Sequence, residues 1–121
     1  MKLQFEVVSD LYCAGRNEFG EEMHCEVFYV MAEDTRGNRW THEAHFPGCA
    51  VTQDEEGYYH FGDVREQARA DAERLKTRIE RAFGRINLDH WSEARPAYGS
   101  AAYVEYGQFD DWMDEQRERG H

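Results

Sequence analysis

One stretch of the chain gathers residue types that bind metals or act as nucleophiles. It reads HEAHFPGC over residues 42–49, and His42, His45 and Cys49 are ligand types that zinc prefers, with Cys25 as a further candidate. Residues 42 and 45 differ by an odd number, so in a regular strand their side chains point to opposite faces. An interior His42 and an exposed His45 are therefore favoured over a metal site, and we expect no cofactor.

The other reactive residues are scattered along the chain. Cys13 has no activating neighbour in sequence, and nucleophilic catalysis needs a base and an orienting group beside the thiol. The acidic runs at 54–56 and 110–111 consist of adjacent residues, whose side chains do not all point one way. No phosphate-binding glycine motif occurs. We predict that the chain is not an enzyme; the alternative is a small metal-dependent or thiol enzyme that uses His42, His45 and Cys49.

A predicted C-terminal helix over residues 108–119 offers a binding surface instead. Its inward face carries Phe109, Trp112 and Met113. Its outward face carries a row of carboxylates that could imitate the phosphates of nucleic acid and occupy a basic cleft, with Tyr103 and Tyr106 nearby as aromatic anchors. A solvated helix face is the competing interpretation. The predicted partner-binding carboxylates are Asp110, Asp111, Asp114, Glu115 and Glu118.

The net charge of −11 is spread unevenly along the chain. Residues 1–61 carry −8, residues 62–86 carry +2 and residues 87–121 carry −5. An acidic total repels nucleic-acid phosphates and attracts basic proteins, so we expect no direct binding of nucleic acid despite a rough arginine stripe over residues 74–85. Internal pairing between the basic segment and its acidic neighbours is the competing explanation of this layout.

The basic segment is also the clearest predicted helix, over residues 63–85. Gly62, Asp63 and Glu66 suggest its start with a capping box, and Gly84 suggests its end. Its apolar residues recur every three or four positions, which is the period of one helix face. They are Val64, Ala68, Ala72, Leu75, Ile79, Ala82 or Phe83, and Ile86. Leu75, Ile79 and Phe83 should therefore lie on a sheet formed upstream.

Strand patterns precede this helix and smaller helices follow it. We predict strands over residues 1–9, 22–33, 39–46 and 58–61, and loops over 11–20, 50–57 and 87–99. A short helix capped by Ser100 is expected through residue 106. This order indicates a single α+β domain spanning residues 1–121: an antiparallel sheet of three to four strands covered on one face by the long helix, plus one or two C-terminal helices.

Cysteine usage and hydropathy suggest the compartment. The three cysteines, at 13, 25 and 49, form an odd and widely spaced set, which argues against a disulfide framework and fits a reducing environment. No apolar run is long enough to span a membrane, and the N-terminus has no signal-peptide pattern. We therefore expect a cytoplasmic protein without a membrane partner.

The segment HWSEARPAYGSAAY over residues 90–103 resembles C-terminal parts of mobile-element proteins. The chain as a whole, short, acidic and without a catalytic motif, is similar in kind to the small acidic accessory proteins of phages and mobile elements, anti-CRISPR inhibitors among them. That resemblance implies stoichiometric binding to a defence protein in a bacterial host cell, through acidic surface. No functional residue is transferred from it. A homodimer through exposed aromatic residues stays open.

Overall fold

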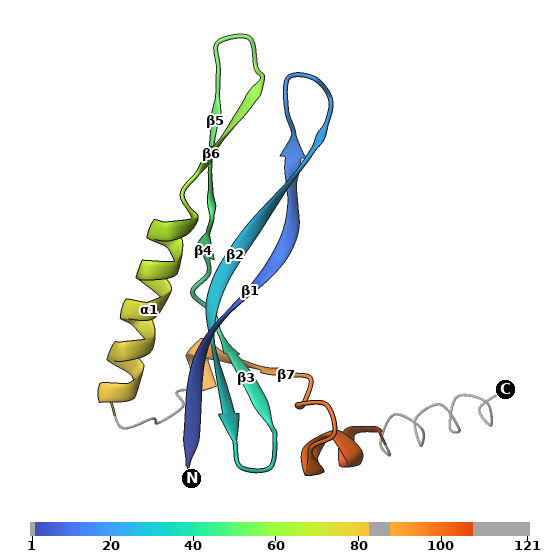
Figure 1. Cartoon of the computed structure of the whole chain (residues 1–121), viewed down its shortest axis with the longest axis vertical. Coiled ribbons are helices and arrows are strands. Elements are labelled where there is room, and N and C mark those ends of the chain that lie inside the picture. The colour runs from blue at the N-terminus through green and yellow to red at the C-terminus, as the bar shows by residue number, and fades with distance from the viewer. Residues whose placement is uncertain (1, 83–87, 108–121) are drawn as a thin grey trace, which may run out of the picture.

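The computed structural model describes residues 2–82 and 88–107, and it confirms an α+β chain dominated by strands (Figure 1). The strands are β1 (Leu3–Arg16), β2 (Glu22–Asp34), β3 (Arg39–His42), β4 (Phe46–Pro47), β5 (Cys49–Gln53), β6 (Tyr59–Asp63) and β7 (Trp91–Ala94). The helices are α1 (Arg65–Arg81), the 3-10 turn η1 (Leu88–His90) and a helical segment at residues 101–107.

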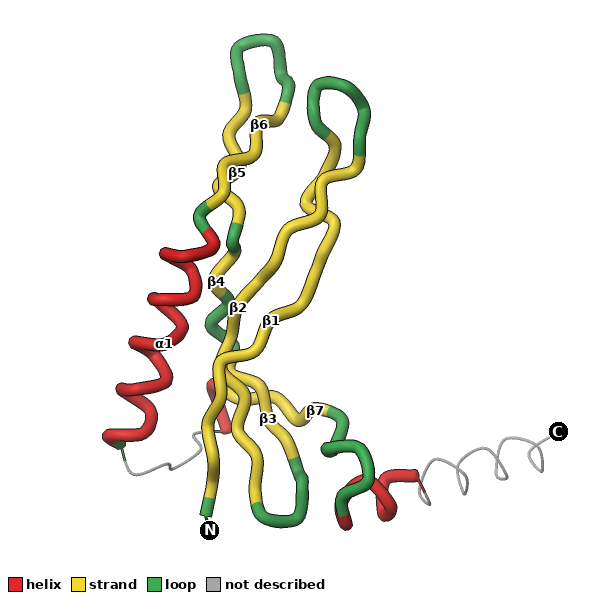
Figure 2. The backbone as a smooth tube through the Cα atoms, in the orientation of Figure 1, coloured by secondary structure: helices red, strands yellow, loops and turns green. Residues whose placement is uncertain are grey.

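Two antiparallel sheets hold these strands together. The larger one has the order β1-β2-β3-β7, with β4 also paired to β2, and the smaller one is the hairpin β5–β6. The long β1–β2 hairpin and the β5–β6 hairpin both project past the N-terminal end of α1 (Figures 1 and 2). We call the projecting parts the two arms: residues 11–24 form the first and residues 49–63 the second.

The predicted first strand is too short and the loop predicted after it is wrong. Pairing of β1 with β2 continues past Ser9, through Leu11 opposite Glu26 and Cys13 opposite His24, to Arg16. Tyr12, Ala14 and Gly15 are only half-buried and the other residues of 11–16 are exposed, so backbone pairing with β2 rather than deep burial sets the structure of this segment. A register shift between Cys13 and Gly15 accommodates the irregular end of the strand.

Three further predictions differ from the strand pairing that the structure shows. The strand predicted over residues 39–46 divides into β3 and β4, which pair with different parts of β2. The loop predicted over 50–57 contains most of β5, which pairs with β6, and the loop over 87–99 contains β7, which pairs with β3. Hydropathy alternation is a weak signal for these strands, since each spans only two to five residues.

All three main hairpin turns share one local design. An Asn or Asp at the first of five residues accepts backbone N–H groups of the third and fifth residues at 2.9–3.0 Å. A glycine with positive φ occupies the fourth position, at Gly20, Gly37 and Gly57. The three turns are residues 17–21 (NEFGE), 34–38 (DTRGN) and 54–58 (DEEGY).

The long helix is shorter than predicted and its capping box does not form. It starts at Arg65, with Val64 as the N-cap and no side-chain capping bond. The Asp63 carboxylate instead accepts the Arg65 backbone N–H at 3.1 Å and binds the Arg65 guanidinium at 2.9 and 3.0 Å. The Asp63 carboxylate, which the sequence predicts to cap the start of the helix, therefore binds the Arg65 side chain instead. The helix ends at Arg81 with Ala82 as its C-cap; Gly84 and Phe83 lie outside the described residues.

Small side chains bring α1 close to the sheet. Ala68 and Ala72 are buried against Phe28 of β2, with Val7 and Phe46 packed around them. Leu75 and Ile79, which the sequence predicts to lie on the sheet, are half-buried and are not part of this cluster. Ala68 and Ala72 pack on Phe28, the largest fully buried side chain of the sheet. Leu75 and Ile79, further along the helix, are less deeply buried.

A second apolar contact joins the edges of the larger sheet. The rings of Phe5 in β1 and Trp91 in β7 lie 6.1 Å apart, and His42 in β3 meets Trp91 edge to face at 5.0 Å. Because β1 and β7 occupy opposite ends of the strand order, this contact requires the sheet to coil strongly.

Cys25 and Cys49 form a disulfide, so the expectation of unpaired cysteines is wrong for these two. Gly48 explains their proximity: its N–H donates to the Glu26 carbonyl at 2.7 Å, and a Cβ at this position would lie 2.7 Å from the same oxygen. The glycine therefore lets the chain cross β2 closely enough to join β5 to it. Cys13 is the free cysteine of the described residues, and it is exposed.

The segment after β7 docks on the turn between β2 and β3. The N–H of Ala97 donates to the Gly37 carbonyl at 2.9 Å, and the N–H of Ala102 donates to the Arg36 carbonyl at 3.0 Å. Ser100 accepts the N–H of Tyr103 through its hydroxyl at 3.1 Å, which confirms the predicted cap. The predicted helix over residues 108–119 lies outside the described residues.

Candidate functional site

The predicted zinc or thiol site does not assemble. Cys49 is bonded to Cys25, which removes its thiolate, and the two histidines have different neighbours. His42 Nδ1 accepts the Ala44 N–H at 3.0 Å, while the His45 ring packs 5.3 Å from that of Tyr29. Within the part of the chain that the structure describes, no three His, Cys, Asp or Glu residues are grouped closely enough to hold a metal ion.

A histidine–carboxylate pair that sequence analysis missed lies beside His42. Glu43 Oε1 and His90 Nδ1 are 2.6 Å apart, and the Glu43 N–H donates to the His90 carbonyl at 2.9 Å. Both side chains are more than half exposed, so the pair fastens η1 to the end of β3 rather than forming a sheltered acid–base site. Burial lowers the pKa of the nearby His42, which stays neutral in this apolar contact with Trp91.

The two predicted aromatic anchors face different surroundings. Tyr103 is half-buried and packs against Tyr98 at 5.1 Å between ring centroids. Tyr106 is 37% exposed, with the Arg95 guanidinium 5.8 Å from its ring, and it lines a cleft of about 500 Å³ with Trp40. The five predicted carboxylates at 110–118 lie outside the described residues.

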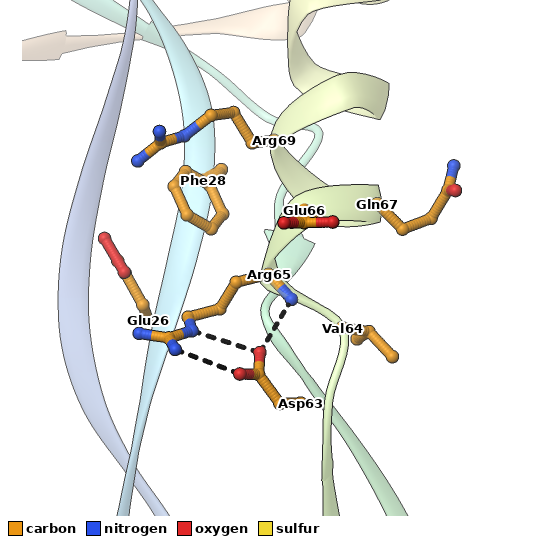
Figure 3. A pocket seen from close by; sticks show the side chains of 8 residues that line it. All are labelled: Glu26, Phe28, Asp63, Val64, Arg65, Glu66, Gln67 and Arg69. Carbon is orange, nitrogen blue, oxygen red and sulfur yellow. Dashed lines mark hydrogen bonds and ion pairs between the residues drawn. The ribbon is translucent and has the colours of Figure 1, made fainter.

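A larger cleft, of about 580 Å³, lies between the start of α1 and β2 (Figure 3). Arg65 in this cleft is already paired with Asp63, and the pair holds the pKa of Asp63 below its usual value. Arg69 lies over the Phe28 ring at 5.2 Å. With Glu26 and Glu66 also in the lining, the cleft has no excess of positive charge for an anionic ligand.

The two arms carry most of the exposed apolar side chains recorded for the described residues. Leu11 and Phe19 in the first arm are 74% and 77% exposed, and three residues of the second arm are close to half exposed. Those three are Val51 (45%), Tyr58 (47%) and Tyr59 (46%). The arms lie side by side, since a methyl group on Gly15 would sit 3.9 Å from Cζ of Phe61.

Acidic side chains accompany these apolar ones at both turns. Glu18 and Glu21 flank Phe19, and Glu55 and Glu56 precede Tyr58; no hydrogen bond or ion pair is recorded for these four carboxylates among the described residues. Asp54 bonds His60 at 2.8 Å. That bond raises the pKa of His60 and lowers that of Asp54, and Glu18 from the other arm also favours the charged imidazole.

No protein-family model, no curated protein and no solved structure matches this chain. Among the described residues, none of the helices has the length and apolar content needed to cross a bilayer.

Proposed function

We propose that this chain is a non-enzymatic acidic binding protein that occupies a basic surface of a host protein that handles nucleic acid. The observation that carries the proposal is the net charge of −11 together with the absence of any buried charged side chain among the described residues. The charge is therefore displayed to solvent, where it attracts basic partners and repels phosphates.

Within this proposal the chain is a phage or mobile-element inhibitor of a CRISPR-type defence complex of a bacterial host. Such a complex holds its nucleic acid in a positively charged channel, which a rigid acidic surface can fill. Helix α1, which packs on β2 through Ala68 and Ala72, would cover one face of the sheet and keep that surface in shape. The carboxylates at 110–118 belong to the same proposed surface.

Capture of proteins from a bacterial lysate on the immobilised chain tests the proposal. Proteins captured from a bacterial lysate should include a basic nucleic-acid-binding protein that elutes when salt is raised. Added chain should then displace nucleic acid from that protein, with displacement complete near one molar equivalent. If nucleic-acid binding by every captured protein persists under an excess of chain, the proposal fails.

The sequence-predicted surface can be tested in the same assay. Reversing the charge of Asp110, Asp111, Asp114 and Glu115 to lysine should abolish capture, because four attractive contacts become repulsive. Circular dichroism and thermal unfolding verify that the variant folds. Undiminished capture would remove the C-terminal carboxylates from the proposed surface.

A further inference from the structure

Of the three hairpin turns that share one design, one is covered and two are free. The turn at 34–38 lies under residues 97–102, and its Arg36 pairs with Glu105. The turns at 17–21 and 54–58 end the two arms and carry exposed Phe19 and Tyr58. The same turn geometry is therefore packed against residues 97–102 at the turn 34–38, and it is exposed to solvent at the turns 17–21 and 54–58.

We propose that the two arms together form the docking surface for a basic protein, with the apolar side chains in direct contact and the carboxylates pairing with arginine or lysine around them. This inference rests on the proposed function and assigns it a site. Apolar centres bordered by charge are what stable protein interfaces use. Charge complementarity selects the occupant: residues 11–24 carry −2 and residues 49–63 carry −4, which together are more than half of the net charge of −11.

The arms are also built to hold this surface in place. Asp54 fixes the second turn through the N–H groups of Glu56 and Tyr58, and Asn17 fixes the first through those of Phe19 and Glu21. The Cys25–Cys49 disulfide and the Gly48 N–H to Glu26 bond anchor the second arm to β2 at its root. A partner therefore meets two pre-ordered turns, which reduces the entropy lost on binding.

A matched pair of variants separates this surface from general electrostatic attraction. The arm variant combines Glu18→Gln, Glu21→Gln, Glu55→Gln and Glu56→Gln. The body variant combines Glu6→Gln, Glu66→Gln, Glu73→Gln and Glu93→Gln. All eight side chains are exposed, none has a recorded side-chain hydrogen bond or ion pair, and both variants lose the same charge. Circular dichroism and thermal unfolding verify that each variant folds.

The probe is a synthetic peptide that alternates arginine with leucine, and a peptide that alternates arginine with serine is its apolar control. Titration calorimetry should show the arm variant binding the leucine peptide about tenfold or more weakly than the unchanged chain, and the body variant about threefold or less. The serine peptide should bind the unchanged chain more weakly than the leucine peptide, because it lacks the apolar contact.

Apolar substitutions give a second, independent measurement. Phe19→Ser with Tyr58→Ser should weaken binding of the leucine peptide, while Tyr98→Ser with Val104→Ser, which removes exposed residues away from the arms, should not. Equal weakening by the arm and body variants, or by the two apolar variants, overturns the arms as the site and leaves the proposed function standing. If the unchanged chain binds neither peptide, both the arm surface and the acidic binding function are overturned.

Discussion

Single residues decide where this chain turns. Each main hairpin turn combines an Asn or Asp at its first position with a glycine of positive φ at its fourth, at residues 17–21, 34–38 and 54–58. This spacing is visible in the sequence and would have located two hairpins that hydropathy alternation misses. A side-chain oxygen that accepts two backbone N–H groups replaces the hydrogen bonds that the backbone gives up at the turn.

Position 37 requires glycine for a second reason that does not apply at position 20. Both have positive φ, but a Cβ on Gly37 would overlap the Ser100 side chain, whereas nothing lies within 4 Å of one on Gly20. Gly20→Ala should lower the free energy of unfolding by about 1 kcal/mol, from backbone strain alone. Gly37→Ala should lower it by about 2–4 kcal/mol, because strain and overlap combine. Urea unfolding of both variants measures the difference; equal losses would show that residues 97–102 do not press on this turn.

The Asp54–His60 hydrogen bond makes the stability of the second turn depend on pH. The bond raises the pKa of His60 and lowers that of Asp54, so the pair of protonated His60 and ionised Asp54 stabilises the turn fully between about pH 4 and about pH 6.5. This contribution is lost as pH rises through the folded-state pKa of His60 or falls through that of Asp54. Asp54→Asn should return the His60 pKa towards its ordinary value while keeping an acceptor for the backbone N–H groups. An NMR titration of the His60 ring protons measures the shift. An unmoved His60 pKa in the variant would contradict the pairing.

At the scale of elements, the disulfide and Gly48 position the second arm. The bond closes a sequence separation of 24 residues between β2 and the first residue of β5. Replacing both cysteines, Cys25→Ala with Cys49→Ala, should lower the free energy of unfolding by about 2–4 kcal/mol. Cys13→Ser should leave the free energy of unfolding unchanged, because Cys13 is an exposed free cysteine. If the oxidised chain and the double variant unfold at the same urea concentration, the bond contributes nothing to stability.

Elements were predictable from the sequence where burial dictates them. Strand β2 was found almost to the residue because its apolar residues are needed on both faces, and α1 was found because Ala68 and Ala72 keep the helical period. Strand β7 was missed because it pairs with β3, which is distant in sequence, and the far half of β1 was missed because it buries little. The Cys25–Cys49 bond was missed because only the crossing of β2 by Gly48 brings the two cysteines together.

At the scale of the whole molecule, repulsion among the excess carboxylates lowers stability while local ion pairs raise it. The recorded pairs, such as Arg39 with Glu33 at 2.8 Å, join atoms at most 4 Å apart and mostly at the surface, where each contributes about 0–1 kcal/mol. The excess of negative charge acts over longer distances. The candidate surface was predictable from composition as an acidic face for a basic partner. Its proposed location depends on the two arms lying side by side, which no local pattern encodes.

This difference in range predicts the response of the free protein to salt. Raising the ionic strength from about 0.01 M to about 0.1 M shortens the Debye length from about 30 Å to about 10 Å. Repulsion among distant carboxylates is then screened, while ion pairs in contact are screened far less, so the melting temperature should rise by a few degrees. Differential scanning calorimetry measures it, and the arm variant with four carboxylates replaced by glutamine should show a smaller rise. A falling melting temperature would mean that attractive pairs outweigh repulsion, and that the displayed charge is neutralised within the molecule instead of being available to a basic partner.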